Sequence, residues 1–332
     1  MVLVLNFKQK SAKQTKVSGV RKAENATRGA EFRLAQKNRA ASANNFKRKN
    51  RAKKARQTAE NPNLQNDKSL GQHWLRDREI LDSIASSAEI ENGDFVLEIG
   101  PGLGTLTSSL LKFAGKDGKV LAVEFDENLA KKLPAQFPGK NLEIINADFL
   151  EFDLEKLPKG YKVAANVPYY ITSKIVEKLL TSANRPAVAS LLVQKEVAER
   201  MAAEAGELSI LAIAAQLYAE VELDILVPRE FFTPPPKVDS QVVVLRARDE
   251  DLLAQFNREN GYELTEKQLF RIVKAGFTAK RKKIATSLSA NLAISKEEVN
   301  ELLKKASISP DIRAQEITIK QWLKLAQIFF VK

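Results

Sequence analysis

A short apolar run that ends directly in a glycine-rich segment constrains the fold of this chain more than any other feature. Asp94-Phe-Val-Leu-Glu-Ile99 leads into Gly100-Pro-Gly-Leu-Gly104, and a helical pattern follows from Thr105 to about Phe113. A strand, a glycine-rich turn and a helix in this order allow the backbone to approach a ligand at the carboxyl edge of a parallel sheet. The segment therefore predicts an α/β fold with a ligand site at the turn.

Six further segments have the apolar character of strands. They are residues 119–124, 141–145, 161–165, 189–193, 223–227 and 241–245. Helical patterns fall between the earlier ones, and this alternation indicates a Rossmann-like parallel sheet with helices on both faces. The last two follow each other without a helix between them, so we expect an antiparallel pair at one edge of the sheet.

The pattern becomes all-helical after about residue 250. Capping-box spacings mark three helix starts, at Thr265/Gln268, Ser295/Glu298 and Thr318/Gln321. We therefore predict a mixed α/β domain over residues 61–249 and a small all-helical domain over residues 250–332.

The positive charge of the chain is concentrated at its start. Residues 1–60 hold 17 Lys and Arg against three Glu, whereas the rest of the chain holds 36 basic and 38 acidic residues. This first segment is poor in large apolar residues, so we expect it to be disordered, or helical only on binding. Basic arms of this kind usually bind nucleic acid. A solvated tail, an over-long start-site assignment and an organelle transit peptide are the alternatives.

Composition excludes several classes of site and location. The chain has no cysteine and a single histidine, His73, which excludes disulfide scaffolds, thiol catalysis and histidine-rich metal centres. Uncharged runs such as Leu208–Ala219 are too short to cross a bilayer, and the apolar start Met1–Leu5 is too short for a signal peptide. We expect a cytoplasmic protein with no bound metal.

The spacing within the glycine turn distinguishes two classes of nucleoside cofactor. A dinucleotide site reads G-x-G-x-x-G, but here Gly100, Gly102 and Gly104 place the third small residue one position earlier. This pattern is more typical of S-adenosylmethionine enzymes, which hold no pyrophosphate. Glu124, at the end of the next strand, can accept from two ribose hydroxyls, and Asp148 can accept from an adenine amino group. A structural turn with exposed acids nearby is the alternative.

The fourth strand ends in Asn166-Val-Pro-Tyr169, which suits methyl transfer to an exocyclic amino nitrogen. The lone pair of such an amine is delocalised into its ring and must be localised before it can attack. The Asn166 side-chain oxygen and the carbonyl of Val167 or Pro168 can accept the amino hydrogens, and Pro168 also stiffens the turn. Tyr169 offers a face on which an extruded base can stack. An ordinary loop with a packed tyrosine is the alternative.

These motifs, with several others in a fixed order, give the chain a specific resemblance. The motifs are Lys68-Ser-Leu-Gly-Gln-His-Trp-Leu75, Glu98-Ile-Gly-Pro-Gly-Leu-Gly104, Asn166-Val-Pro-Tyr169, Gln194-Lys-Glu196, Phe232-Thr-Pro-Pro-Pro-Lys-Val-Asp-Ser240, Gly276-Phe-Thr-Ala-Lys-Arg-Lys-Lys283 and Asp311-Ile-Arg-Ala-Gln-Glu316. Over about residues 62–328 the chain resembles the KsgA-type small-subunit ribosomal RNA adenine dimethyltransferases. The resemblance implies dimethylation of two adjacent adenines near the RNA 3′ end during ribosome assembly.

The resemblance also implies roles for individual residues. His73 and Leu75 stand where the family has cofactor contacts in a segment that closes over S-adenosylmethionine. Phe232 matches the aromatic residue that brackets the target adenine together with Tyr169, although Phe231 beside it is equally able to point inward. The positions that match the family's cofactor contacts are Gly100, Glu124, Asp148 and Asn166.

The resemblance implies partners as well. Ribosomal RNA and the small-subunit assembly particle are the expected partners of a monomeric enzyme. The basic run Lys280–Lys283 in the helical domain is a candidate for RNA phosphate contacts, with a solvated helix face as the alternative.

Three other functions remain open at this point. A related family methylates an adenine of large-subunit ribosomal RNA and confers macrolide resistance, but the Phe232–Ser240 motif and the long helical part favour the small-subunit type. A DNA adenine methyltransferase more often has two prolines before the tyrosine. A non-catalytic ribosome-assembly factor on the same fold is disfavoured because the predicted cofactor residues are intact.

We expect the basic arm to supply most of the long-range attraction to RNA, since the rest of the chain carries no net positive charge. Each neutralised phosphate adds about 0.7–0.9 to the slope of log affinity against log salt. If six of the 17 basic residues engage RNA, deletion of residues 1–60 should flatten that slope by roughly 4–5. RNA affinity of both proteins at several salt concentrations measures this. Equal slopes for the two proteins would show that the arm takes no part in RNA binding.

Overall fold

A seven-stranded sheet in the order β4-β3-β2-β5-β6-β9-β7 forms the centre of the computed structural model, which describes residues 73–330. Its strands are β2 (Phe95–Ile99), β3 (Lys119–Glu124), β4 (Leu142–Asn146), β5 (Lys162–Asn166), β6 (Val188–Gln194), β7 (Ala219–Val227) and β9 (Ser240–Ala247). The first five strands in this order pair in parallel, and β9 is antiparallel to both β6 and β7. The predicted α/β fold and its antiparallel edge pair are therefore confirmed.

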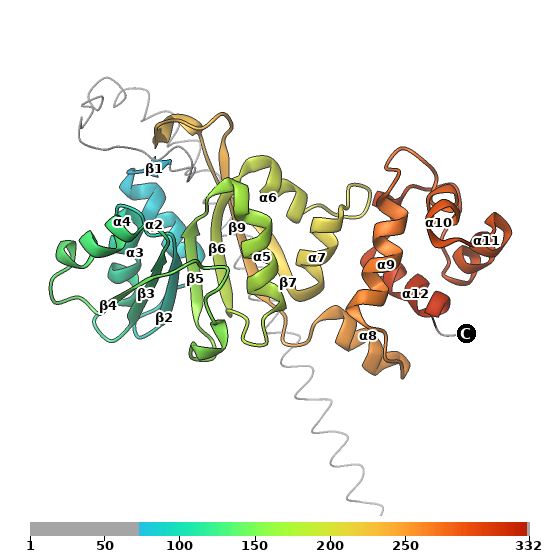
Figure 1. Ribbon diagram of the computed structural model, residues 1–332, viewed down its shortest axis with the longest axis horizontal. Helices are drawn as coiled ribbons and strands as arrows, with labels where there is room; N and C mark the ends of the chain where they lie inside the picture. The colour runs from blue at the N-terminus through green and yellow to red at the C-terminus, as the bar shows by residue number, and fades with distance from the viewer. Residues whose placement is uncertain (1–72, 331–332) are drawn as a thin grey trace, which may run out of the picture. The chain divides into compact units, whose positions relative to one another are not determined.

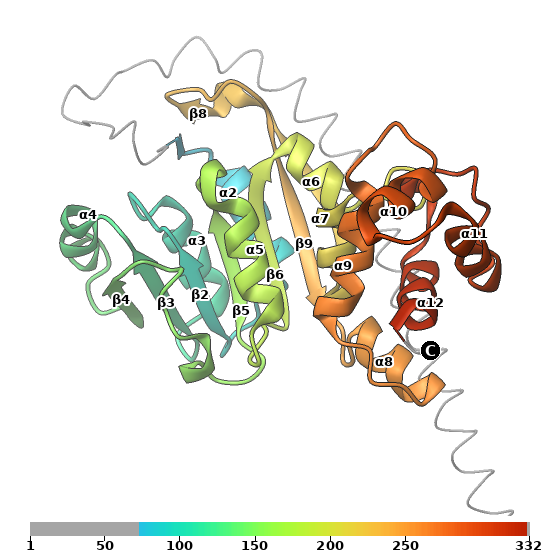
Figure 2. The same cartoon turned by 45° about the vertical axis from the view of Figure 1, so that its right-hand side comes forward.

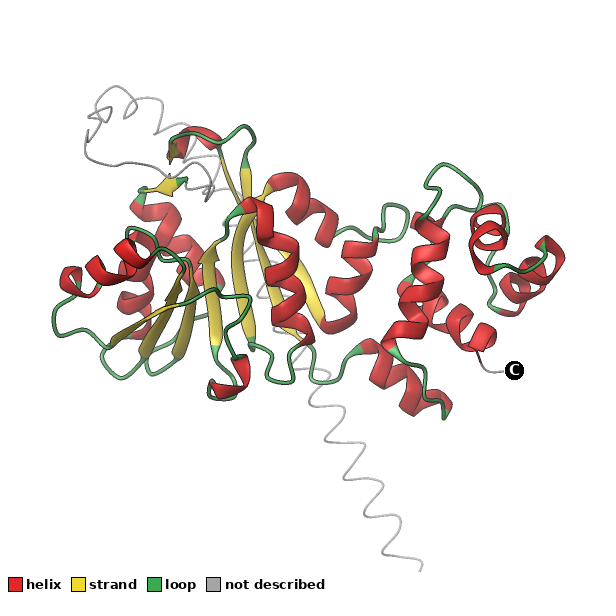
Figure 3. Ribbon diagram, viewed as in Figure 1, coloured by secondary structure: helices red, strands yellow, loops and turns green. Residues whose placement is uncertain are grey.

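Helices cover both faces of this sheet. They are α2 (Arg78–Ser87), α3 (Thr105–Ala114), α4 (Glu127–Lys132), α5 (Thr172–Thr181), α6 (Lys195–Met201) and α7 (Ile210–Tyr218). Figures 1 and 3 show α5, α6 and α7 in front of the sheet and α2 and α3 behind it. Because both faces are covered, the central strands are mainly apolar, and Leu97, Val163 and Leu191 are fully buried.

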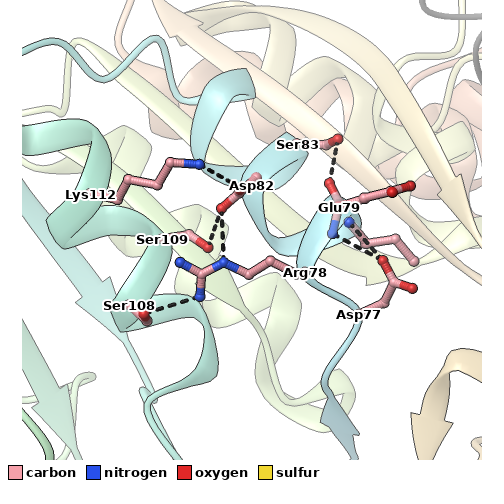
Figure 4. A network of polar contacts seen from close by, with 9 residues as sticks. Asp77, Arg78, Glu79, Asp82, Ser83, Ser108, Ser109 and Lys112 are labelled. Atoms are coloured by element: carbon pink, nitrogen blue, oxygen red, sulfur yellow. Dashed lines mark hydrogen bonds and ion pairs between the residues drawn. The ribbon is translucent and has the colours of Figure 1, made fainter.

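A polar network ties α2 to α3, the helix that follows the glycine turn (Figure 4). Asp82 on α2 accepts from Ser109 and Lys112 on α3, both at 2.8 Å, and Arg78 donates to Ser108 at 3.0 Å. Burial alone would raise the pKa of Asp82, but the hydrogen bonds from Lys112 and Ser109 bring it below its usual value. The carboxylate therefore stays charged and holds the two helices in register.

The last part of the chain is all-helical. Its helices are α8 (Leu252–Asn260), α9 (Glu266–Phe277), α10 (Ile284–Leu292), α11 (Lys296–Lys305) and α12 (Ile319–Phe330). The reciprocal hydrogen bonds of all three predicted capping boxes are present. Figure 2 shows α9 to α12 gathered together, and Trp322 of α12 is fully buried against Gly276 of α9.

The described residues belong to one compact unit, so a division into separate domains at residues 249 and 250 stays a prediction. No helix between residues 73 and 330 has the length and apolarity that a membrane span requires. The predicted basic arm, residues 1–60, lies outside the described residues.

Candidate active site

The glycine turn is open on one side and covered on the other. Gly100 follows β2 directly, has a φ of +66° and donates its N–H to the Val123 carbonyl at 2.9 Å. A Cβ atom built on Gly100 would meet nothing within 4 Å, whereas one on Gly102 would lie 2.4 Å from the Trp74 ring. The space beside Gly100 can therefore receive a ligand in close contact with the backbone, and Trp74 closes the turn at Gly102.

Glu124, at the end of β3, binds this turn through its carboxylate. One oxygen accepts from the Gly102 N–H at 2.9 Å and the other from the Asp126 N–H at 2.8 Å. Burial raises the pKa of Glu124, although the N–H groups of Asp126 and Gly102 oppose that effect. Only 7% of the residue is exposed. Each carboxylate oxygen has a second lone pair, so the group can still accept hydrogen bonds from a ligand.

A second buried acid, Glu98, lies beneath the turn on β2, and its role was not predicted from the sequence. Among residues 73–330 its only side-chain hydrogen-bond partner is Thr107 of α3, whose hydroxyl donates at 2.6 Å. Burial raises the pKa of Glu98 to about 8, against the Thr107 hydrogen bond and with a contribution from the charge of Glu124. The carboxyl is therefore mostly protonated at neutral pH and ties β2 to α3 as a neutral group. An acid inside an apolar strand was the available signal.

Asn166, the last residue of β5, has a fixed side-chain orientation. Its Nδ2 donates to the backbone carbonyl of His73 at 3.3 Å. A carbonyl oxygen can only accept, so the amide group that faces it must be the NH₂. Among residues 73–330, no group donates a hydrogen bond to the Asn166 Oδ1. A side-chain carbonyl oxygen is thus held in place at the carboxyl end of the sheet with its acceptor capacity unused.

Two contacts fix the side chain of Tyr169, one at its hydroxyl and one on its ring. Its hydroxyl shares a 2.6 Å hydrogen bond with Ser240 of β9, and its ring stacks on that of His73 with centroids 5.9 Å apart and planes 24° apart. The His73 Nδ1 in turn bonds the Pro234 carbonyl at 2.8 Å, so this nitrogen carries the proton. Burial raises the pKa of Tyr169, which keeps the phenol neutral. One face of the tyrosine is therefore covered by a histidine.

Two very short strands, separated in sequence by more than 150 residues, cover this region. β1 (Trp74–Leu75) pairs antiparallel with β8 (Phe232–Thr233), so that Leu75 lies opposite Phe232. We call this pair the β1–β8 ribbon, and Figures 1 and 2 place it beyond one end of the large sheet. Leu75 is 1% and Phe232 is 3% exposed, while Phe231 is half-buried. Of the two phenylalanines, Phe232 is the one turned inward.

The ends of β3 and β4 contribute the remaining candidates. Asp148 is exposed, and its Oδ1 accepts from the Leu150 N–H at 2.8 Å. No hydrogen bond joins it to Glu124 or Asn166 among the described residues. Phe125, directly after Glu124, is 62% exposed, and Asn146 fixes its backbone by donating to its carbonyl at 3.1 Å. Phe125 was not among the residues predicted from the sequence, although an aromatic residue after a strand-ending acid was a usable signal.

Taken together, the structure joins most of the predicted site residues through direct contacts. His73 connects to Asn166 and Tyr169, and its neighbour Trp74 connects to the glycine turn and hence to Glu124. Leu75 and Phe232 face each other in the β1–β8 ribbon. Asp148 is not joined to this group of residues by any hydrogen bond within residues 73–330. No group of three or more potential metal ligands occurs within residues 73–330.

The chain is similar to one family of known proteins over most of its length. The model of the ribosomal RNA adenine dimethylase family matches residues 63–330. Ribosomal RNA small subunit methyltransferase A of Dehalococcoides mccartyi (strain CBDB1) is 36% identical over 82% of this chain and 91% of its own. The basic arm lies outside the family match.

Two solved structures extend the likeness to the fold. A dimethyladenosine transferase from Plasmodium falciparum is 28% identical, with a TM-score of 0.63 over 76% of this chain and 96% of its own. The 23S ribosomal RNA methyltransferase ErmE is 32% identical, with a TM-score of 0.60 over 77% and 98%.

The protonated Glu98 predicts a specific dependence of stability on pH. Between its ordinary pKa of 4.5 and about 8, the folded state keeps a proton that the unfolded chain has lost. The stability from this group is therefore full below pH 4.5 and lost as the pH rises to about 8, at up to about 1.4 kcal/mol per pH unit. Glu98→Gln has no such proton and should become more stable relative to the parent across this window.

Urea unfolding of the full chain at several pH values between 5 and 8 measures this difference. Glu127→Gln, at an exposed acid of α4, is the matched control and should follow the parent. Parallel curves for Glu98→Gln and the parent would show that Glu98 is ionised in the folded protein.

Proposed function

The chain belongs to the ribosomal RNA adenine dimethylase family, and we propose that it transfers methyl groups from S-adenosylmethionine to adenines of small-subunit ribosomal RNA. The acceptor is the exocyclic amino nitrogen, and two adjacent adenines near the 3′ end are dimethylated during ribosome assembly. Relatives named ribosomal RNA small subunit methyltransferase A, which match about four fifths of the chain, support this choice of RNA. The unused acceptor oxygen of Asn166 is the observation on which the chemistry rests.

The residues at the glycine turn fit S-adenosylmethionine. The open space at Gly100 admits the amino-acid part of the cofactor against the backbone, and Glu124 keeps lone pairs for the ribose hydroxyls. Asp148 is assigned to the adenine amino group, and the exposed ring of Phe125 lies one residue beyond Glu124, where it can pack on the adenine face. The cofactor supplies an electrophilic methyl group on a sulfonium centre.

His73 and Leu75 are assigned to the cover of the cofactor. Trp74 between them already packs on Gly102, so the backbone of this segment follows the glycine turn closely. The segment also accepts the Asn166 hydrogen bond. Binding of the cofactor and orientation of the catalytic amide are thus coupled through the same few residues.

Asn166 and the turn after it prepare the amine for attack. The Asn166 Oδ1 accepts one amino hydrogen, and a backbone carbonyl accepts the other. The Pro168 carbonyl already receives the Ile171 N–H at 3.3 Å and the Thr172 hydroxyl at 3.4 Å. In the turns, loops and caps of residues 73–330, no backbone N–H donates to the Val167 carbonyl. The Val167 carbonyl is therefore favoured as the second acceptor. Two acceptors draw the amino hydrogens out of conjugation and concentrate the lone pair on nitrogen.

Tyr169 and Phe232 are assigned to the target base. Tyr169 supplies a ring of fixed orientation, because Ser240 and His73 hold it. Phe232 is buried in the β1–β8 ribbon, so its contact with a base requires a shift of the ribbon. Pro168 keeps the turn between Asn166 and Tyr169 rigid.

A large-subunit target is the second candidate, favoured by the likeness to ErmE. Mass spectrometry of both ribosomal RNAs from cells with and without the protein separates the two. Loss of dimethyladenosine from small-subunit RNA supports the proposal, and loss from large-subunit RNA alone supports the second candidate. Unchanged modification of both RNAs would favour a non-catalytic assembly factor.

The same proposal includes the setting of the enzyme. It acts as a cytoplasmic monomer without metal on the small-subunit assembly particle, and the helical part assists in RNA binding. Lys280, Arg281 and Lys282 are exposed at the turn between α9 and α10 and can meet phosphates, whereas Lys283 is paired with Asp311 at 2.7 Å.

Glu124→Ala should lower the affinity for S-adenosylmethionine at least tenfold. The ribose loses its acceptor, and a hydrogen bond to a charged group contributes about 1.5–3 kcal/mol. Calorimetric titration measures the affinity, and Glu127→Ala at the exposed neighbouring acid is the control. Parental affinity in Glu124→Ala would exclude the ribose assignment.

Asn166→Ala should abolish methylation and leave RNA binding intact, because the phosphate contacts lie elsewhere. Tyr169→Phe should keep much of the activity, while Tyr169→Ala should lose it, because stacking needs the ring rather than the hydroxyl. Transfer of a labelled methyl group to RNA and filter binding measure the two quantities. Normal turnover by Tyr169→Ala would contradict the stacking assignment.

A further inference from the structure

Tyr170, the residue directly after Tyr169, is 64% exposed. Within residues 73–330 its side chain makes no hydrogen bond, ion pair or ring contact. Tyr169 beside it is hydrogen-bonded through its hydroxyl and stacked through its ring. Two adjacent tyrosines at the candidate active site are thus held very differently, and the second is largely exposed.

The backbone that carries Tyr170 is braced on both sides. Residues Tyr169–Ile171 form one turn of 3-10 helix, in which the Ile171 N–H bonds the Pro168 carbonyl and the Thr172 N–H bonds the Tyr169 carbonyl. α5 continues from Thr172 without a break. The exposed ring therefore projects from a rigid support and not from a mobile loop tip.

The nucleotide whose base binds at Tyr169 remains covalently joined to the adjoining nucleotides of the RNA. The bases of those nucleotides lose a stacking partner when the target base is extruded. Single-stranded RNA sites commonly compensate this loss with exposed aromatic rings, because every base has a face that can stack. Consecutive Cα atoms lie only 3.8 Å apart, so Tyr170 is within reach of a nucleotide adjoining the one at Tyr169.

The charge around Tyr170 suits a nucleic acid strand. Ser173 and Lys174 in the first turn of α5 are exposed, and the start of this ten-residue helix has no side-chain cap. The positive end of the helix dipole and the Lys174 ammonium both favour the phosphate that links two nucleotides. These groups accompany the aromatic ring and do not define a site by themselves.

We propose that Tyr170 is a second stacking platform, which holds the nucleotide next to the target adenine while that adenine occupies the site at Tyr169. This inference rests on the proposed function and deepens it. Where two adjacent adenines are methylated in turn, the base held by Tyr170 is the other adenine. Tyr170 then positions the RNA without taking part in the chemistry at the amino nitrogen.

The test compares Tyr170→Ala and Tyr170→Phe with the parent in the full-length protein. Tyr262→Ala is the matched control, because Tyr262 is also exposed, at 37%, but lies between α8 and α9. Methylation is measured on small-subunit particles that lack the modification. Tyr170→Ala should raise KM for the particle roughly 5- to 150-fold, the equivalent of one base–aromatic stack, with little change in kcat for the first methyl group. Tyr170→Phe and Tyr262→Ala should retain the parental KM.

A second readout does not depend on methylation. An RNA with 2-aminopurine next to the target adenine should show quenched fluorescence when bound to the parent or to Tyr170→Phe, and less quenching with Tyr170→Ala. Unchanged affinity of each variant for S-adenosylmethionine shows that the fold is intact.

The outcomes separate this inference from the proposed function. Failure of the parent to methylate small-subunit particles would contradict the proposed function, and the fluorescence comparison would still test Tyr170. If the parent methylates and Tyr170→Ala matches it in KM and in quenching, the platform role is excluded and the proposed function stands. A fall in kcat alone, with KM and quenching unchanged, would also overturn the inference.

Discussion

The contacts of His73 and Trp74 connect the glycine turn, the end of β5 and Tyr169 into one site. The Trp74 ring packs on Gly102, which donates to Glu124, and the His73 carbonyl accepts from Asn166. The His73 ring covers one face of Tyr169. A glycine is required at position 102 because any Cβ there would overlap the indole. The proposed cofactor side and the proposed base side of the site therefore share two residues that belong to neither the large sheet nor its helices.

Two buried acids beneath the turn show how environment decides charge. Glu124 has a backbone N–H on each carboxylate oxygen, and these donors stabilise the ion and limit the effect of burial on its pKa. Glu98 has Thr107 as its only side-chain hydrogen-bond partner among residues 73–330, and burial, with a contribution from the charge of Glu124, favours its neutral form. The charge of one buried carboxylate raises the free energy of ionising the other under the same turn. The two backbone donors thus favour the ionised form of Glu124 at the end of β3, where the ribose is proposed to bind, and the neutral Glu98 ties β2 to α3.

The large sheet, the capped helices and the order of the motifs could be predicted because they rest on local periodicity and turn chemistry. The β1–β8 ribbon could not, because each strand has two residues and their pairing joins positions more than 150 residues apart. No periodicity signals such a contact. The stacking of His73 on Tyr169 follows from that pairing and was equally hidden, although both residues were singled out as candidates. Glu98 was read only as part of a motif, because its burial depends on the packing of α3 over β2.

A base that contacts Phe232, as proposed, must displace the β1–β8 ribbon, so the burial of the ribbon sets the energy of that step. Complete burial of a leucine or phenylalanine side chain contributes about 1.5–3 kcal/mol, so exposing Leu75 and Phe232 together would cost about 3–6 kcal/mol. Stacking of one base on an aromatic ring returns only about 1–3 kcal/mol. A single stack is therefore too weak to displace the ribbon. A base can reach Tyr169 from the face that His73 leaves uncovered. Otherwise, phosphate contacts of the RNA must supply the free energy that the stack does not return. In that second case, positive charge near the site contributes to catalysis as well as to capture of the RNA.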